Sequence, residues 1–320
     1  MTLANCRVLA LILSISLGAS AQEIIVLGGA TRSEIPEARS FGLALSYAHD
    51  LGPYLAAGVT YKNEGHVPAH HRDGHAAMLW LKAEVLEPEL SLAAGAGPYH
   101  YFDTTVAEGG RDFADAHGWG FLYGATATWR ARRSPWIYQL RIDRVETRHN
   151  LDTTSLLLGI GYRLDQDGSF AANSAPRARA RDHGDEIVLA AGQTIVNSFE
   201  SQSALARTVE YRHAFGPVVR ASIGWINEGD ARLIRRDGVV VQGWLEPSFY
   251  RDRLTLGLGY GAYLSVDRYR PGERDLMGVL TTSASYHLGN HWVGRFSWHR
   301  IASRIDRDSD IILLGMGYRY

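Results

Sequence analysis

The stretch Asp310–Tyr320, DIILLGMGYRY, decides the fold class. Its residues fall into two alternating sets, and side chains that alternate in this way point to opposite faces of a β-strand. One set is apolar and ends in two tyrosines, whereas the other is rich in glycine and ends in Arg319. A close copy, SLLLGIGYRL, occupies Ser155–Leu164. Two such strands in one chain indicate a duplicated β-structure.

An internal repeat extends over most of the chain. Tyr47–Pro53 (YAHDLGP) matches Tyr211–Pro217 (YRHAFGP), and the triplets Asn-Glu-Gly and Arg-Asp-Gly also recur, all at an offset of 164 residues. After the fifth expected strand the offset is 156, as in the pair Trp136 and Trp292. A repeat of this length indicates a duplicated architecture, and it is a stronger guide to the fold than the propensities of single residues. Each copy is predicted to form eight strands.

The connections and faces of these strands predict an outer-membrane β-barrel. Tight turns such as 52–53 and 216–217 alternate with longer polar segments such as 64–73 and 104–117, which we expect to be loops. Outer-membrane barrels show this alternation, with their short turns facing the periplasm. The mean hydropathy of -0.16 excludes a helical membrane protein but suits strands whose lipid-facing and lumen-facing residues alternate. A soluble periplasmic all-β protein is the alternative.

The chain divides into a targeting segment, two repeats and a linker. Arg7, the apolar run 8–17 and Ala19-Ser20-Ala21 predict a cleaved signal peptide over residues 1–21. The repeats span 22–165 and 186–320, and the polar, arginine-rich segment 166–185 between them is predicted to be a linker. A single barrel of sixteen strands would need only a tight turn there. We therefore expect an all-β chain of about 16 strands, as two duplicated eight-stranded transmembrane antiparallel β-barrels in tandem.

Composition and motifs restrict the partners. The formal net charge is -1, so no basic footprint for nucleic acid is visible. Neither a P-loop nor a dinucleotide-binding fingerprint is present, and no cofactor is expected. An aromatic residue at the chain end, Tyr320, resembles the assembly signal read by the outer-membrane insertion machinery. The expected partners are that machinery and the lipid and lipopolysaccharide of the outer membrane.

The seventh strand of the second copy carries the first candidate for chemistry. The shape of Phe296–Tyr320 resembles the end of the lipid A 3-O-deacylases, which are eight-stranded outer-membrane barrels. Those proteins carry a His-x-Ser catalytic pair on one strand, then a polar loop and a final strand closing in Gly-x-x-Tyr-Arg-aromatic. The resemblance covers about the last 25 residues of each copy. It implies a catalytic role for His299, with Ser303, Ser297 and Asp308 as candidate partners.

The residues depart from that family pattern in two respects. Ile301, rather than serine, lies two positions after His299, and the first copy has no histidine at the matching place. The alternation of Phe296 and Trp298 also turns His299 toward the lumen, away from lipid. We therefore favour a polar lumen network here, and a structural, surface or narrow-pore role for the protein. A lipid A-modifying acyl hydrolase is the alternative function.

The segment Asn63–His75, NEGHVPAHHRDGH, is the second candidate. Its four histidines, at 66, 70, 71 and 75, are possible metal ligands, but the second copy has no histidine between its Asn-Glu-Gly and Arg-Asp-Gly triplets. We therefore predict no metal site, and a loop held by ion pairs at the barrel mouth. The polar residues assigned to the loops and lumen are Glu64, Arg72, Asp73, Glu228, Arg236 and Asp237.

Overall fold

The structure is a computed structural model. It describes residues 22–35, 37–67, 70–86, 89–106, 113–132, 134–164, 184–198, 200–216, 218–249 and 253–320. The predicted signal peptide, 1–21, and nearly all of the predicted linker, 166–185, lie outside these residues. No helix in the described part of the chain is long and apolar enough to cross a membrane.

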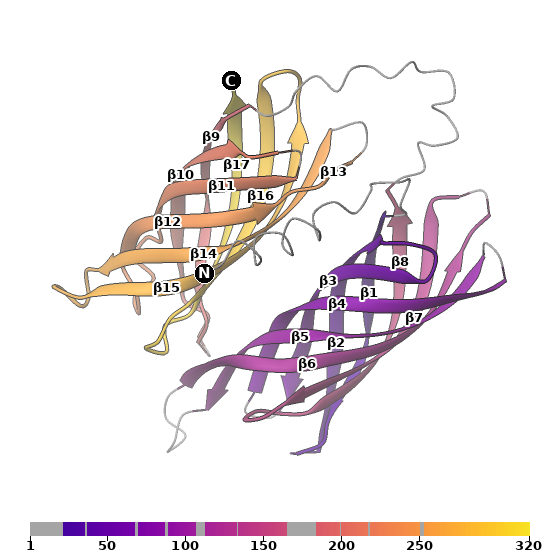
Figure 1. The fold of residues 1–320 in the computed structure, drawn as a ribbon. Helices are drawn as coiled ribbons and strands as arrows, with labels where there is room; N and C mark the ends of the chain where they lie inside the picture. Colours follow the sequence, from indigo (N-terminus) through magenta and orange to yellow (C-terminus); the bar gives the residue numbers. More distant parts are fainter. Residues whose placement is uncertain are drawn as a thin grey trace, which may run out of the picture. The chain divides into compact units, whose positions relative to one another are not determined.

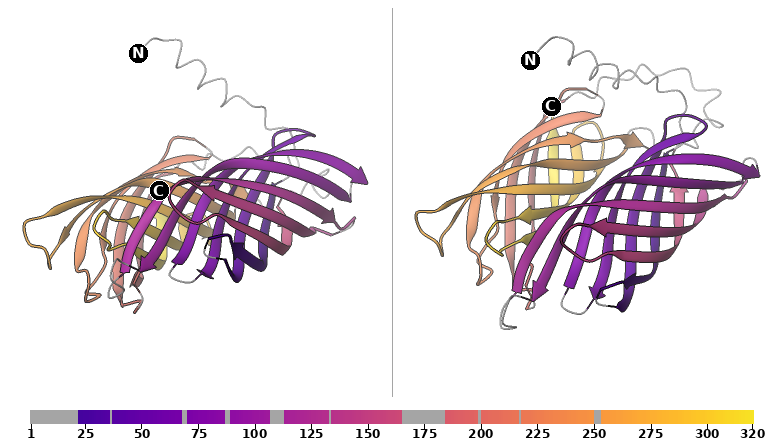
Figure 2. Two further views of the ribbon diagram at one scale, coloured as in Figure 1. Left: turned by 90° about the horizontal axis from the view of Figure 1, so that it is seen from below. Right: turned by 60° about the horizontal axis from the view of Figure 1, so that its bottom comes forward.

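The first barrel consists of eight antiparallel strands that close on themselves (Figures 1 and 2). Strand β1 pairs with β2 on one side and with β8 on the other, so that Ile24 lies opposite Tyr162. This pairing confirms two barrels, because a single large barrel would pair β1 with the last strand of the chain. The strands are β1 Gln22–Ser33, β2 Ala38–Asp50, β3 Leu55–Val67, β4 His70–Leu86, β5 Leu90–Val106, β6 Phe113–Arg130, β7 Trp136–Thr147 and β8 Thr153–Arg163.

The second barrel closes in the same way. Strand β9 pairs with both β10 and β17, and β12 pairs with β14 to complete the ring, while the short β13 adds to the start of β14. Figure 1 shows these strands in colours from salmon through orange to yellow. The strands are β9 Glu186–Val196, β10 Ser203–Ala214, β11 Val219–Asn227, β12 Arg236–Leu245, β13 Ser248–Phe249, β14 Leu254–Asp267, β15 Arg274–His287, β16 Trp292–Ala302 and β17 Ser309–Arg319.

The two faces of each strand have different environments. In β17, Leu314 is 71% exposed on the outer face, whereas its neighbour Leu313 is 1% exposed on the inner face. The outer faces of both barrels are predominantly apolar, and the interiors are filled by side chains, as expected for eight strands. The inner faces include many charged and hydroxyl residues, but also apolar clusters such as Ile226, Val240, Met277, Ile301, Ile311 and Leu313.

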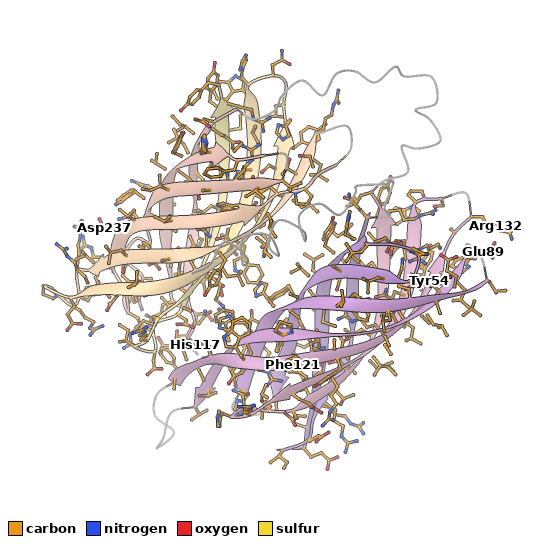
Figure 3. All side chains as sticks on the ribbon, in the orientation of Figure 1. Tyr54, Glu89, His117, Phe121, Arg132 and Asp237 are labelled. Atoms are coloured by element: carbon orange, nitrogen blue, oxygen red, sulfur yellow. The ribbon has the colours of Figure 1, made fainter. Side chains whose placement is uncertain are left out.

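Aromatic pairs recur at the end of each barrel where the short turns lie. Trp136 lies opposite Tyr162 with ring centroids 5.5 Å apart, and Trp292 lies opposite Tyr318 at 5.2 Å. Figure 3 labels Tyr54, Glu89 and Arg132 at this end of the first barrel. Trp and Tyr in such rings are typical of barrels that meet a membrane interface.

The long loops predicted over 64–73 and 104–117 are wrong in extent. Strand β3 continues to Val67 and β4 begins at His70, while β5 reaches Val106 and β6 begins at Phe113. The hydrogen-bonded ladder does not need apolar side chains, so it continues through polar sequence. A bulge between Asn63 and His66 absorbs the irregularity in β3.

Candidate functional site

An ion-pair cluster with the same three positions occurs inside both barrels. In the first barrel, the Arg72 guanidinium on β4 donates to the Glu64 carboxylate on β3 and, at 3.2 Å, to Thr153 Oγ1 on β8. The Thr153 hydroxyl also donates to Glu64. All three side chains are at most 1% exposed. We call this group the upper cluster of the first barrel.

The upper cluster of the second barrel is Glu228, Arg236 and Ser309. Arg236 Nε and Nη2 each donate to a Glu228 carboxylate oxygen at 2.8 Å, and Nη2 also donates to Ser309 Oγ at 2.9 Å. The Ser309 hydroxyl donates to Glu228 Oε2 at 2.7 Å. These residues are also at most 1% exposed. Each upper cluster therefore joins three strand segments across a barrel interior.

The Asn-Glu-Gly triplet explains why the glutamate lies at this place. Asn63 Oδ1 accepts a hydrogen bond from the Gly65 amide at 2.9 Å, and Asn227 Oδ1 accepts one from the Gly229 amide at 3.1 Å. The two glycines have φ values of +68° and +74°, in the left-handed region that L-residues rarely adopt. A Cβ atom at either glycine would lie 2.5 Å from a backbone oxygen of the neighbouring strand. The triplet thus lies at a bulge in β3 of the first barrel and at the end of β11 in the second, while the glutamate still points inward.

A second group lies deeper in the first barrel. Asp143 accepts from Arg141 Nε at 2.6 Å and from Lys62 Nζ at 3.4 Å, and all three side chains are at most 1% exposed. Lys62 also donates to Ser155 Oγ at 2.8 Å. The Arg141 guanidinium lies 5.0 Å from the centroid of the Trp80 ring, within reach of a cation–π interaction.

In the second barrel, the imidazole of His299 is hydrogen-bonded to two uncharged hydroxyl groups. Its Nε2 lies 3.1 Å from Ser297 Oγ, and its Nδ1 lies 2.8 Å from Thr281 Oγ1, which also accepts from Gln242 at 2.8 Å. The side chains of Ser297 and His299 are 6% and 5% exposed inside the barrel. Among the described residues no carboxylate contacts this imidazole.

The remaining two candidate catalytic residues form a separate group. Asp308 Oδ1 accepts from the Ser303 amide at 2.6 Å, and Ser303 Oγ accepts from the Arg307 amide at 2.9 Å. These contacts fix the turn between β16 and β17. The four candidates therefore do not form a Ser-His-Asp arrangement, in which the acid must orient the histidine.

The two aspartates assigned to the barrel mouth lie outside the upper clusters. Asp73 accepts from the Tyr61 hydroxyl at 3.1 Å, and Asp237 (labelled in Figure 3) lies 3.6 Å from Arg268. The reason is the strand period: each aspartate directly follows an inward arginine and so points outward.

The histidines of the first barrel form ring contacts. The centroids of the His66 and His71 rings are 4.3 Å apart, and those of Tyr61 and His75 are 5.2 Å apart. Within the described residues no group of three or more histidine, cysteine or acidic side chains could hold a metal ion.

Sequence reasoning missed the arginine–tryptophan contacts. Arg212 lies 4.1 Å from the centroid of the Trp244 ring, as Arg141 does from Trp80 at 5.0 Å. The recurrence of Trp80 and Trp244 at one offset was the available signal. It did not reveal their partners, because these arginines lie on different strands in the two barrels.

The chain matches no protein-family model, and no curated protein is significantly similar to it. Solved structures match individual barrels. The N-terminal β-barrel domain of OprF from Pseudomonas aeruginosa is 14% identical over 45% of this chain and 96% of that chain, with a TM-score of 0.37. Ail, the attachment invasion locus protein of Yersinia pestis, is 14% identical over 45% and 98%, with a TM-score of 0.35. Neisserial surface protein A is 13% identical over 46% and 97%, with a TM-score of 0.35.

Proposed function

We propose that this chain is an outer-membrane protein whose two barrels both cross the membrane with closed interiors. Its role is structural or at the cell surface rather than that of an open pore. The outer faces support membrane insertion, because large apolar side chains are exposed around both rings. Examples from five strands are Leu79, Leu158, Leu189, Leu276 and Leu314. Exposed apolar area of this extent needs lipid or protein to cover it.

The observation that carries the closed-interior proposal is the pair of upper clusters. Glu64 with Arg72, and Glu228 with Arg236, are buried and bonded to a hydroxyl on the closing strand. An ion crossing either interior would have to separate an ion pair that is almost inaccessible to water. Breaking a buried pair costs about 3–5 kcal/mol, so spontaneous opening should be rare.

Two measurements test this proposal. Purified protein in planar lipid bilayers should give no stepwise conductance, and regular steps would contradict a closed interior. In cells, the protein should fractionate with the outer membrane and migrate differently on gels before and after heating. A protein found in the soluble periplasmic fraction would refute membrane insertion. We also propose lipopolysaccharide as the surrounding lipid and the outer-membrane insertion machinery as the assembly partner.

A lipid A-modifying acyl hydrolase is the second candidate function. Its support is the 3.1 Å contact between Ser297 Oγ and His299 Nε2. The burial of both side chains and the bond of His299 to Thr281 favour the structural role instead. Mass spectrometry of lipid A from expressing cells decides between them. Loss of an acyl chain that disappears in His299→Ala would establish the hydrolase and refute the structural proposal.

A further inference from the structure

The first barrel contains a small, partly open pocket toward its short-turn end. Its volume is about 50 Å³, room for a few water molecules or one small ion rather than for a drug-sized ligand. Small and hydroxyl-bearing residues form much of its wall, together with Trp80 and several charged side chains. The wall includes Ser46, Ala48, Ala56, Thr60, Lys82, Gln139 and Arg141.

The second barrel has an ion-pair cluster at the corresponding positions. Strand pairing establishes the correspondence: Ser46 lies opposite Ile25 and Thr60, and Glu210 lies opposite Val188 and Gly224, at matching places in the two sheets. By the same repeat, Ala48, Ala56, Gln139 and Lys82 correspond to Arg212, Arg220, Arg295 and Glu246.

These larger side chains pair with one another in the second barrel. Arg212 Nη1 lies 3.0 Å from both Glu210 oxygens, and Arg295 Nη1 lies 3.1 Å from Glu246 Oε1. Arg220 Nε lies 3.1 Å from the other Glu246 oxygen. The pocket of the first barrel therefore exists where alanines and a serine replace arginines and a glutamate.

The charges around this pocket do not balance. Glu23 pairs with Arg130 at 2.6 Å and Asp50 pairs with Lys82 at 2.5 Å, so each of these charges has an opposite partner. Above them, Lys62 and Arg141 share the single carboxylate of Asp143. Among the described residues, Arg141 Nη2 is buried and donates no hydrogen bond.

One positive charge therefore remains uncompensated in a buried site. Burial of a charge without a partner is costly, and the cost is reduced by an opposite charge nearby. The second barrel supplies such charges at this level from its own Glu210 and Glu246.

We propose that the pocket of the first barrel binds a small inorganic anion, with chloride as the simplest example, beside Arg141. The guanidinium supplies the charge, and its Nη1 donates to Ser46 Oγ at 2.9 Å and to Thr60 Oγ1 at 3.4 Å. The two hydroxyl groups bond to each other at 2.9 Å, which leaves one hydroxyl hydrogen to donate to the anion. The bound anion takes the part that the Glu210 carboxylate plays in the second barrel.

Thermal unfolding of the purified full chain in detergent tests this proposal. Chloride replaces gluconate stepwise at constant ionic strength, so that general salt effects stay fixed. We expect a melting temperature that rises and saturates with chloride, by a shift on the order of 5 °C. A melting temperature that does not respond to chloride overturns the proposal.

Two substitutions of Ser46 distinguish the effect of charge from the effect of side-chain size. Ser46→Glu brings in the carboxylate that the second barrel has, so it should be stable in gluconate and insensitive to chloride. Ser46→Gln, its neutral match in size, should lack that stabilisation in gluconate. Equal melting temperatures of the two variants in gluconate would refute the electrostatic role. Crystals grown in bromide provide a readout independent of these variants: an anomalous peak beside Arg141 supports the site, and its absence refutes it.

Discussion

Removal of the Glu228 carboxylate should destabilise the second barrel by about 3–5 kcal/mol, the usual cost of breaking a buried ion pair. The carboxylate accepts two hydrogen bonds from Arg236 at 2.8 Å and one from Ser309 at 2.7 Å. Both charged side chains are 0% exposed. Glu228→Ala would leave the Arg236 charge buried without its partner, which accounts for the size of the effect.

Intermediate substitutions give a graded series. Glu228→Gln keeps one oxygen acceptor but loses the charge, so we expect a loss of about 1.5–3 kcal/mol, the range for hydrogen bonds to charged groups. The double variant Glu228→Leu with Arg236→Met removes both charges and should recover part of the stability lost in Glu228→Ala. Greater stability of the double variant than of Glu228→Leu alone would show that the uncompensated arginine, rather than a cavity, causes the loss.

The assay is equilibrium unfolding in urea after reconstitution into lipid vesicles, followed by tryptophan fluorescence and by the gel shift on heating. Asp237→Ala is the matched control, because Asp237 pairs with Arg268 at 3.6 Å near the surface. The Asp237 side chain is 25% exposed and the Arg268 side chain is 58% exposed. Such a pair contributes about 0–1 kcal/mol. If Glu228→Ala costs no more than this control, the upper cluster does not stabilise the barrel and the reasoning is refuted.

Three further predictions concern the backbone, a loop and the outer face. Gly229→Ala should lower the free energy of unfolding in urea by about 1–2 kcal/mol, because the φ of Gly229 is +74°. Gly243→Ala is the control, because a Cβ there meets nothing within 4 Å, and it should lack that penalty. Equal losses of stability in the two variants would contradict backbone strain at Gly229. The Tyr269 hydroxyl lowers the pKa of the Asp230 carboxyl, so this contact should stabilise the loops above the unfolded-state pKa and be lost as pH falls through the folded-state pKa. Tyr269→Phe should raise that pKa in an NMR titration, and an unchanged value would refute the contact. Leu314→Arg should cost about 2–4 kcal/mol in lipid vesicles, and a neutral effect would place β17 outside the membrane.

The alternation of side chains made the strands predictable from sequence. Leu314 and Leu313 are equally apolar, yet period two assigns them to opposite faces, and their exposures of 71% and 1% agree with that assignment. The offset between Ser155–Leu164 and the last strand indicated two equivalent closing strands. Pairing of β1 with β8 confirms the tandem arrangement that the linker favoured.

Strand ends were predicted less well, because backbone pairing does not depend on apolar sequence. The histidine-rich segment after Gly65 was expected to be a loop, but His71 lies on β4 opposite His66 on β3. Hydrogen bonds between the two strands continue past the last apolar residues. Local composition carries little information about where such a ladder stops.

The upper clusters were only partly predictable. The repeated Glu64 and Arg72 lie close in sequence and were expected to pair. Their third member, Thr153, lies far along the chain on β8, and only closure of the barrel brings it to them. For the same reason, the resemblance around His299 could not show that Ser297 and Thr281, rather than an acid, contact the imidazole.

The sequence by itself determined the fold class of this protein, a duplicated β-barrel. Side-chain alternation and a long repeat can be recognised in the chain without knowing which residues are in contact. Only the tertiary structure decided which buried charges meet. Barrel closure places residues from distant strands at one level of the interior, and whether Arg141 meets a carboxylate there depends on every strand around it. The same closure converts Ala48 and Ala56 into the wall of a pocket, where the second barrel has Arg212 and Arg220 instead.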